Sequence, residues 1–151
     1  MVTKFRIADS NDSEIVVDMV VNLLTELRGA LVEKEAYIQA SKKLLSENKQ
    51  YTVFLAYTSS FEYLGFISVF ESSSIRTFGE YGVIQELFVY PEYRSIQIGR
   101  GLLSMVKNFA IDKGWERLEV GAPNSEKWGR SVAFYLREGF SEVGPRLKLS
   151  I

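Results

Sequence analysis

The sequence predicts an α/β fold of the mixed α+β kind: a central, mixed but mostly antiparallel sheet of about six to seven strands, flanked by about four helices. Three observations support this class. Long segments have apolar residues at helical spacing, shorter segments are rich in valine, isoleucine and aromatic residues, and one strand–helix–strand order falls in the second half of the chain. The 151 residues, 46% of them hydrophobic, suit a single domain over residues 1–151.

The amino-terminal third predicts one strand and two helices. Residues 3–8 alternate apolar and polar side chains, which favours a half-buried strand. Helical spacing follows from about residue 13 and ends at Gly29, because glycine readily adopts the left-handed conformation that terminates helices. A second amphipathic helix is predicted over residues 33–47.

The middle of the chain predicts three strands. Residues 51–57 and 63–70 are rich in valine, isoleucine and aromatic residues and are separated by a short polar segment, as in an antiparallel hairpin. Gly65 within the second strand indicates a bulge or a close backbone approach. The serine-containing segment 71–80 is predicted to be a loop, and residues 83–89 form the next strand.

The carboxyl-terminal part predicts two helices and three strands. A helix from Gly99 or Arg100 to Lys113 precedes a short strand over residues 117–121, so the strands on either side of this helix should pair in parallel. A last helix extends over about residues 127–138. Residues 140–143 and 146–151 are predicted as terminal strands.

Two absences limit the chemistry, since the chain has neither cysteine nor histidine. Disulfides, thiolate nucleophiles, Ser-His-Asp and Cys-His triads and the usual zinc and iron sites all need sulfur or imidazole. We therefore expect no metal. A general base must be a carboxylate, a lysine, a tyrosine or water.

The net charge of −1 gives no electrostatic reason to expect nucleic acid or an anionic membrane surface as a partner. No apolar run approaches the roughly 18 residues of a spanning helix, and no signal-peptide pattern opens the sequence. The expected location is the cytoplasm.

The most informative stretch is residues 81–113, in which an apolar strand leads through Pro91 and a glycine-bearing loop into a helix. A loop that opens a helix directs unpaired backbone N–H groups and the positive end of the helix dipole at one point, which favours an anion. This stretch resembles the central motif of the GNAT acyltransferases, whose pyrophosphate loop reads Arg/Gln-x-x-Gly-x-Gly/Ala. Arg94 falls on the first position and Gly99 on the last, whereas Gln97 replaces the first glycine.

The resemblance implies a GNAT-like fold and acetyl-CoA, or a related acyl-CoA, as the cosubstrate. A backbone N–H near Phe88 and Val89 would stabilise the oxyanion, and the loop and helix start would hold the pyrophosphate. The alternative for Arg94 and Arg100 is that both are solvated arginines flanking the start of a helix. The implied cofactor-binding residues are Phe88, Val89, Arg94, Ile96, Gln97, Ile98, Gly99, Arg100 and Gly101.

The segment from Ser131 to Phe140 resembles a second GNAT motif, in which an aromatic–tyrosine pair precedes Gly-Phe. Tyr135 occupies the tyrosine position, where a phenol could protonate the departing thiolate of CoA. The alternative is a tyrosine that only packs in the core. The family often has an asparagine about two helical turns before this tyrosine; Trp128 stands there, and Asn124 lies one turn further back.

Glu86 is the candidate base. On a regular strand Ile84, Glu86 and Phe88 would share one face, so the carboxylate would point away from Leu87 and Val89. The alternative is a glutamate in a structural ion pair.

The function implied is N-acetyl transfer from acetyl-CoA to a primary amine by direct attack while both substrates are bound. The acceptor could be a small molecule or a peptide, and a homodimer is possible because the terminal strands could supply an edge. A non-catalytic acyl-CoA-binding or interaction module with the same fold is the alternative.

Overall fold

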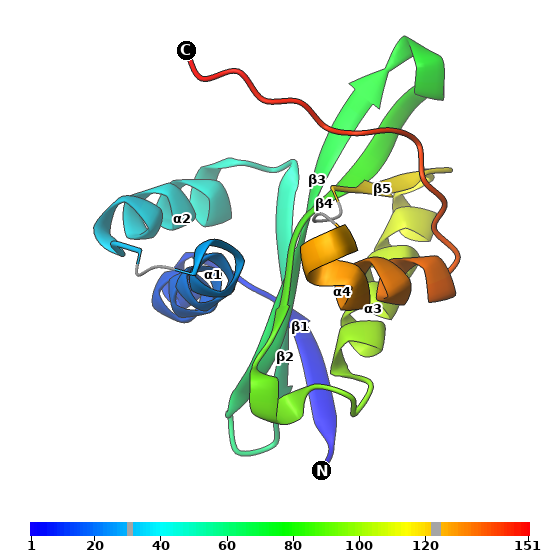
Figure 1. Ribbon diagram of the computed structural model, residues 1–151. Coiled ribbons are helices and arrows are strands. Elements are labelled where there is room, and N and C mark those ends of the chain that lie inside the picture. Colours follow the sequence, from blue (N-terminus) through cyan, green and yellow to red (C-terminus); the bar gives the residue numbers. More distant parts are fainter. Residues whose placement is uncertain (30–31, 122–124) are drawn as a thin grey trace. The chain divides into compact units, whose positions relative to one another are not determined.

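The computed structural model describes residues 1–29, 32–121 and 125–151, which divide into two compact units, Met1–Glu119 and Val120–Ile151. Within the described residues, five strands form one sheet in the order β1-β2-β3-β4-β5 (Figure 1). The pairings from β1 through β4 are antiparallel. The strands are β1 (Thr3–Ile7), β2 (Tyr51–Thr58), β3 (Tyr63–Ser74), β4 (Gly79–Val89) and β5 (Leu118–Val120).

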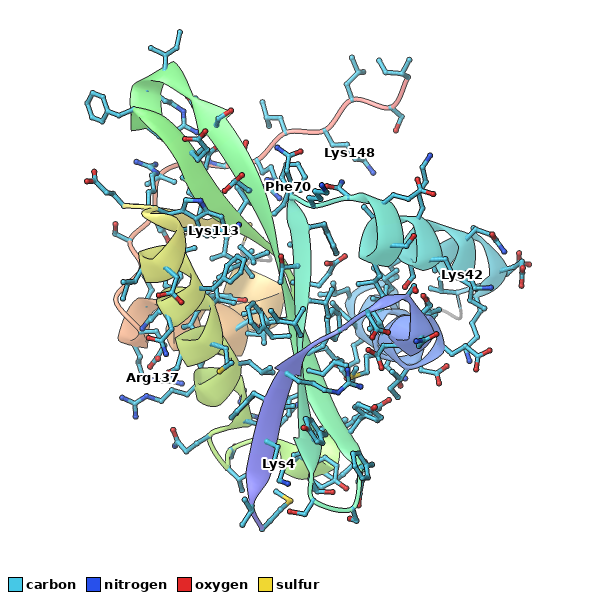
Figure 2. All side chains as sticks on the ribbon, turned by 180° about the vertical axis from the view of Figure 1, so that it is seen from behind. Lys4, Lys42, Phe70, Lys113, Arg137 and Lys148 are labelled. Atoms are coloured by element: carbon cyan, nitrogen blue, oxygen red, sulfur yellow. The ribbon has the colours of Figure 1, made fainter. Side chains whose placement is uncertain are left out.

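In the first unit, helices cover both faces of the sheet. Helices α1 (Ser13–Arg28) and α2 (Glu35–Glu47) lie against one face and α3 (Ile98–Lys113) against the other (Figure 1). Side chains of α1, α2 and the sheet fill the layer between them (Figure 2). The buried members of this core are Ala8, Val16, Met19, Val53, Leu55, Phe66 and Phe88.

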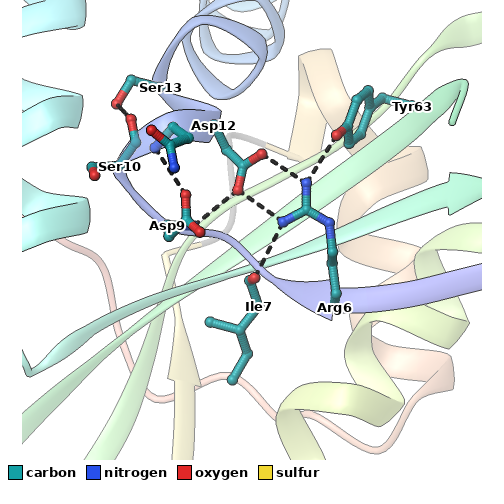
Figure 3. A network of polar contacts seen from close by, with 8 residues as sticks. Arg6, Ile7, Asp9, Ser10, Asp12, Ser13 and Tyr63 are labelled. Carbon is teal, nitrogen blue, oxygen red and sulfur yellow. Dashed lines mark hydrogen bonds and ion pairs between the residues drawn. The ribbon is translucent and has the colours of Figure 1, made fainter.

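Ion pairing and hydrogen bonding fix the start of α1. Arg6 on β1 donates to both carboxylate oxygens of Asp12, at 2.8 and 2.7 Å, and to the Tyr63 hydroxyl of β3 at 2.9 Å (Figure 3). The Asp9 amide donates to Asp12 Oδ2 at 2.9 Å, and the Asp9 side chain accepts from the Asn11 amide, so this turn caps itself. The network joins β1, β3 and the beginning of α1, which ends at left-handed Gly29 as predicted.

The predicted loop over residues 71–80 is wrong, because β3 and β4 continue pairing through most of it. Glu71 pairs with Gly82, Ser72 with Tyr81 and Ser73 with Glu80, and the turn is a short 3₁₀ helix, Ile75–Thr77. Strand pairing uses backbone groups, so serines that suggest a loop by composition are compatible with a two-stranded extension.

The prediction for Gly65 is confirmed. The pairing of β2 with β3 shifts register between Ala56 and Tyr57, opposite this glycine. A Cβ atom at Gly65 would lie 2.4 Å from the Phe88 carbonyl oxygen, so the backbones approach too closely for a side chain.

The second unit contains α4 (Ser125–Arg137), followed by Gly139 with φ of +100°. The two predicted terminal strands are wrong: residues 140–151 are neither helix nor strand. Leu147 and Leu149 are 91% and 82% exposed despite their alternation with polar residues. Alternation describes side chains only, whereas a strand also needs a neighbouring backbone to bond with. This difference explains why the sheet has fewer strands than the six to seven expected.

None of the described helices combines the length and apolar character needed to span a bilayer.

Candidate active site

A bulge in β4 determines where Glu86 points. Ser68 of β3 pairs with Glu86, but the next residue, Val69, pairs with Ile84, so Gln85 is left without a partner in the ladder. Residues paired across an antiparallel ladder share a face, and Ser68 and Val69 point to opposite faces. Glu86 and Ile84 therefore lie on opposite faces, which corrects the expectation from regular alternation.

The corrected geometry places Glu86 on the face covered by α1 and α2. Phe88, two residues further along β4, is buried in the core beneath α1. The Glu86 carboxylate is half-buried, and its Oε1 accepts hydrogen bonds from the Tyr51 hydroxyl of β2 and the Ser68 hydroxyl of β3. The Glu86 amide donates to Ser68 Oγ at 3.0 Å. Burial, with the charge and hydrogen bond of Glu86, raises the pKa of Tyr51, so this phenol remains a donor.

The end of β4 directs one backbone amide to the edge opposite β3. Tyr90 N donates to Leu64 O at 3.0 Å, so Tyr90 and, by alternation, Phe88 bond toward β3. Val89 points the other way, and Arg94 Nε reaches its carbonyl oxygen at 2.8 Å. At the start of β4, Gly82 N donates to Arg117 O, just before β5, at 3.1 Å. Of the predicted pair Phe88 and Val89, Val89 has the amide that faces this edge.

Arg94 connects three parts of the first unit. Besides its bond to Val89, its Nη2 donates to Glu26 Oε1 of α1 at 2.7 Å, and its guanidinium carbon lies 5.6 Å from the centre of the Phe88 ring. Both charged side chains are about one-third exposed, 35% for Arg94 and 30% for Glu26. This arginine therefore anchors the loop to β4 and α1.

The loop before α3 contains two left-handed residues that are not glycine. Ser95 has φ of +66° and Gln97 has φ of +74°. Gln97 is the residue immediately before α3, and its side chain makes no capping hydrogen bond. A left-handed residue followed by right-handed ones turns successive amides toward a common point, an arrangement that binds anions. The backbone that the motif assigns to glycine is thus kept with glutamine in its place.

The first turn of α3 offers backbone donors to this point. Gly101 N donates to Gln97 O at 3.0 Å, which starts the helical ladder, so the amides of Ile98 and Gly99 precede the first intrahelical bond. Ile98 is buried, with only 3% of the residue exposed, whereas Ile96 is 48% exposed. Arg100 is exposed in the same turn.

Gly101 has a packing role. A Cβ atom there would lie 2.5 Å from Cζ of Phe5 on β1. This glycine lets the beginning of α3 approach the sheet, and with it the loop that precedes the helix.

These features form an anion-favouring helix start at the end of a strand that also holds a carboxylate. Residues 23–149 match the family model of the acetyltransferase (GNAT) domain. The chain belongs to this GNAT family.

Among curated proteins, this GNAT chain is similar to the IAA acetyltransferase of Azospirillum brasilense, with 35% identity over 74 residues. That match spans 48% of this chain and 46% of the relative, so the chain aligns with about half of that protein's length.

Solved structures show the same fold. The ribosomal-protein-alanine N-acetyltransferase of Brucella melitensis biovar Abortus 2308 superposes with a TM-score of 0.81 at 14% identity, covering 99% of this chain and 100% of that one. A predicted acetyltransferase of Clostridium acetobutylicum, solved with acetyl-CoA, has a TM-score of 0.79 at 17% identity, covering 99% and 96%.

The second GNAT motif lies in the second unit. Tyr135 is 8% exposed, and its ring lies 5.3 Å from that of Phe134 and 5.4 Å from that of Phe140. Burial raises the pKa of Tyr135 to about 12. The phenol is therefore protonated at neutral pH, as a proton donor must be. Asn124 lies outside the described residues.

Sequence reasoning missed Tyr51 and Ser68 as partners of Glu86. Ser68 could have been noticed, because it is a single hydroxyl in the apolar run from Leu64 to Phe70. Tyr51 begins its strand, and no pattern distinguishes it from the other tyrosines. Within the described residues, no group of three or more acidic side chains is arranged to hold a metal ion.

Proposed function

We propose that this GNAT domain transfers an acetyl group from acetyl-CoA to a primary amine by direct attack, with both substrates bound together. The observation that supports this most is the composition of β4. One strand contributes a carboxylate at Glu86 and an edge-facing amide at Val89, and it leads into the anion-favouring start of α3.

The chain's residues fit the cosubstrate. The amides of Ile98 and Gly99 and the left-handed Gln97 backbone would receive the pyrophosphate, with Arg100 nearby in the same turn. Arg94 would support this loop by holding Val89 and Glu26. Acetyl-CoA supplies the thioester whose carbonyl carbon the amine attacks with loss of the CoA thiol.

An ammonium acceptor must lose one proton before attack, and Glu86 would accept it as general base. Glu86 and Val89 are three residues apart, which is about 10 Å along a strand. The transfer would therefore pass through water. Val89 N–H would donate to the developing oxyanion, and Tyr135 would give its phenolic proton to the departing sulfur, as the motif implies. The second amine proton then restores Tyr135, and Glu86 releases its proton to solvent.

The test is calorimetric titration with acetyl-CoA and CoA, followed by an amine panel that measures thiol release. We expect a micromolar Kd, about −8 kcal/mol, and amine-dependent release of thiol. The chain has no cysteine and so adds no thiol background. Binding without turnover on any amine would favour the non-catalytic acyl-CoA-binding module, and no binding at millimolar ligand would reject both functions.

Glu86→Gln tests the base directly. The variant should flatten the acid limb of the pH–rate profile, because an amide cannot accept the proton. A profile identical to that of the parent would remove Glu86 from this role.

A further inference from the structure

Three hydrogen bonds join Glu86 to Ser68 and Tyr51, and two of them end at the carboxylate oxygen Oε1. Ser68 Oγ accepts from the Glu86 backbone amide at 3.0 Å and donates to Glu86 Oε1. Tyr51 donates to the same oxygen from β2. Ser68 has no exposed surface, so its hydroxyl cannot exchange these contacts for water without disturbing the sheet.

The two carboxylate oxygens of Glu86 differ in their hydrogen bonding. Both donors recorded for the side chain bond Oε1, and among the described residues no recorded donor reaches Oε2. A carboxylate oxygen that accepts two hydrogen bonds has less capacity for a further proton, whereas the other oxygen keeps its acceptor sites. The carboxylate is thus held by one oxygen and presents the other.

The bulge makes this arrangement possible. Since Gln85 has no partner in the ladder, Glu86 pairs directly with Ser68 while Ile84 turns to the opposite face. Bulges bend a strand locally and re-aim side chains, and they are frequent beside active sites. Here the bulge turns Glu86 toward the two hydroxyl groups.

We propose that Ser68 and Tyr51 are positioning residues for general-base catalysis: they fix Oε1 of Glu86 and leave Oε2 to receive the proton of the amine acceptor. This inference rests on the proposed function. The ammonium N–H bond breaks, the proton passes to Oε2 through water, and the neutral amine keeps the electron pair for attack on the acetyl carbon. The carboxyl group formed on Glu86 later releases the proton to solvent.

Two hydroxyl side chains contact the Glu86 carboxylate in the described structure. Tyr51 is the titratable group recorded in contact with it from β2, and β3 contributes the neutral Ser68. No charged side chain of the described parts of α1 or α2 is recorded in contact with the carboxylate. Glu86→Gln therefore removes the carboxylate of this cluster while Tyr51 and Ser68 keep their hydroxyl groups.

The experiment is a double-mutant cycle of Ser68→Ala, Glu86→Gln and the double variant, with Tyr51→Phe measured alongside. Ser68→Ala and Tyr51→Phe should each lower kcat about 10-fold or more, in line with impaired general-base catalysis. In the Glu86→Gln background, Ser68→Ala should change kcat less than about 2-fold, because the group that it positions is gone. Acetyl-CoA affinity should match that of the parent throughout.

Two further readouts separate positioning from general damage. Ser68→Ala should keep the acid limb that Glu86→Gln loses, because the base is still present. In urea unfolding, which needs no cosubstrate, the effects of Ser68→Ala and Glu86→Gln should be non-additive if their side chains are in contact.

Matched controls come from the same unit. Ser41→Ala removes another buried serine hydroxyl, one without a hydrogen-bond partner, and Tyr63→Phe removes a tyrosine hydroxyl that bonds Arg6 instead. Both should retain parental kcat. If Ser68→Ala does not fold, Ser68→Thr, which keeps the hydroxyl, and Tyr51→Phe test the same idea.

Different results would overturn the inference alone or the proposed function with it. An active parent with parental kcat in Ser68→Ala and Tyr51→Phe would overturn the inference alone, as would rate effects of Ser68→Ala and Glu86→Gln that multiply independently. A parent that turns over no amine would overturn the proposed function and this inference together.

Discussion

Arg94 Nη2 donates to Glu26 Oε1 at 2.7 Å, which joins the loop before α3 to α1. Because this arginine also bonds the Val89 carbonyl and lies over the Phe88 ring, the ion pair is one of several contacts that hold it. In the proposed binding of acetyl-CoA, Arg94 would therefore hold the loop, in addition to any contact with phosphate.

Glu26→Gln should reduce the free energy of unfolding by less than about 1 kcal/mol, because partly exposed ion pairs contribute little. Its acetyl-CoA Kd should remain within about twofold of the parent value, since Arg94 still bonds Val89. Arg94→Ala should lower the free energy of unfolding further and raise the acetyl-CoA Kd more than twofold. Urea unfolding and calorimetric titration measure the two effects. Equal losses of affinity in the two variants would instead mean that the link to α1 alone holds the loop.

Gln97→Gly should leave the free energy of unfolding unchanged or raise it by up to about 1 kcal/mol, because glycine adopts a φ of +74° without steric cost. We also propose that the Gln97 amide donates to phosphate, and its loss should weaken acetyl-CoA binding about 2- to 10-fold. Thermal unfolding and calorimetry provide the measurements.

Gln97→Ala is the matched variant, because it lacks the amide but keeps the left-handed strain. It should bind acetyl-CoA as weakly as Gln97→Gly and be less stable. Parental affinity in both variants would remove support for a phosphate contact from Gln97.

Tyr135→Phe should lower the rate about 10- to 1000-fold with nearly unchanged acetyl-CoA affinity, as expected for loss of a general acid. The pKa of Tyr135 is about 12, so the parent phenol stays protonated below about pH 11 and should cause no basic limb in that range. Steady-state kinetics against pH tests both points. The aromatic ring is kept, so a large loss of stability in this variant would indicate that the hydroxyl is structural.

Asp12→Asn should reduce stability at neutral pH by about 1–3 kcal/mol, because it removes the charge-assisted partner of Arg6. The hydrogen bond from Arg6 lowers the pKa of Asp12 in the folded chain despite burial. Its stabilisation is therefore present above the unfolded pKa of about 3.9 and is lost as pH falls through the folded value.

Urea unfolding at several pH values should show the parent and Asp12→Asn converging as the pH falls below about 4. Tyr63→Phe is the control, since it keeps the carboxylate–guanidinium pair and should retain the acid dependence. A stability difference between parent and Asp12→Asn that did not change with pH would show that the ion pair is not the source of the effect.

Apart from the extension of β3 and β4 over residues 71–80, periodicity predicted the elements of the first unit, because amphipathic helices and apolar strands are local patterns. The face of the sheet to which Glu86 points could not be predicted from periodicity. Alternation assumes a regular strand, but the pairing of β4 with β3 skips Gln85, and the sequence of β4 does not reveal this bulge.

The residues of the loop before α3 show a second limit of prediction from the sequence. Matching Arg94 and Gln97 to a family pattern located the loop, but only the structure shows that Arg94 bonds Glu26 and that Gln97 keeps the left-handed backbone. The partners of Glu86 come from β2 and β3, so they are separated from it in sequence by 35 and 18 residues.

The contact between Gly101 and Phe5 links the proposed phosphate loop to β1, which lies at an edge of the sheet. Edge strands open more readily than central ones, so their amides exchange with solvent sooner. Restraining the start of α3 with a bound anion should therefore slow amide exchange within residues 3–7 as well as at the loop. Exchange measured with and without CoA would reveal the amino-terminal strand as a remote reporter of ligand binding.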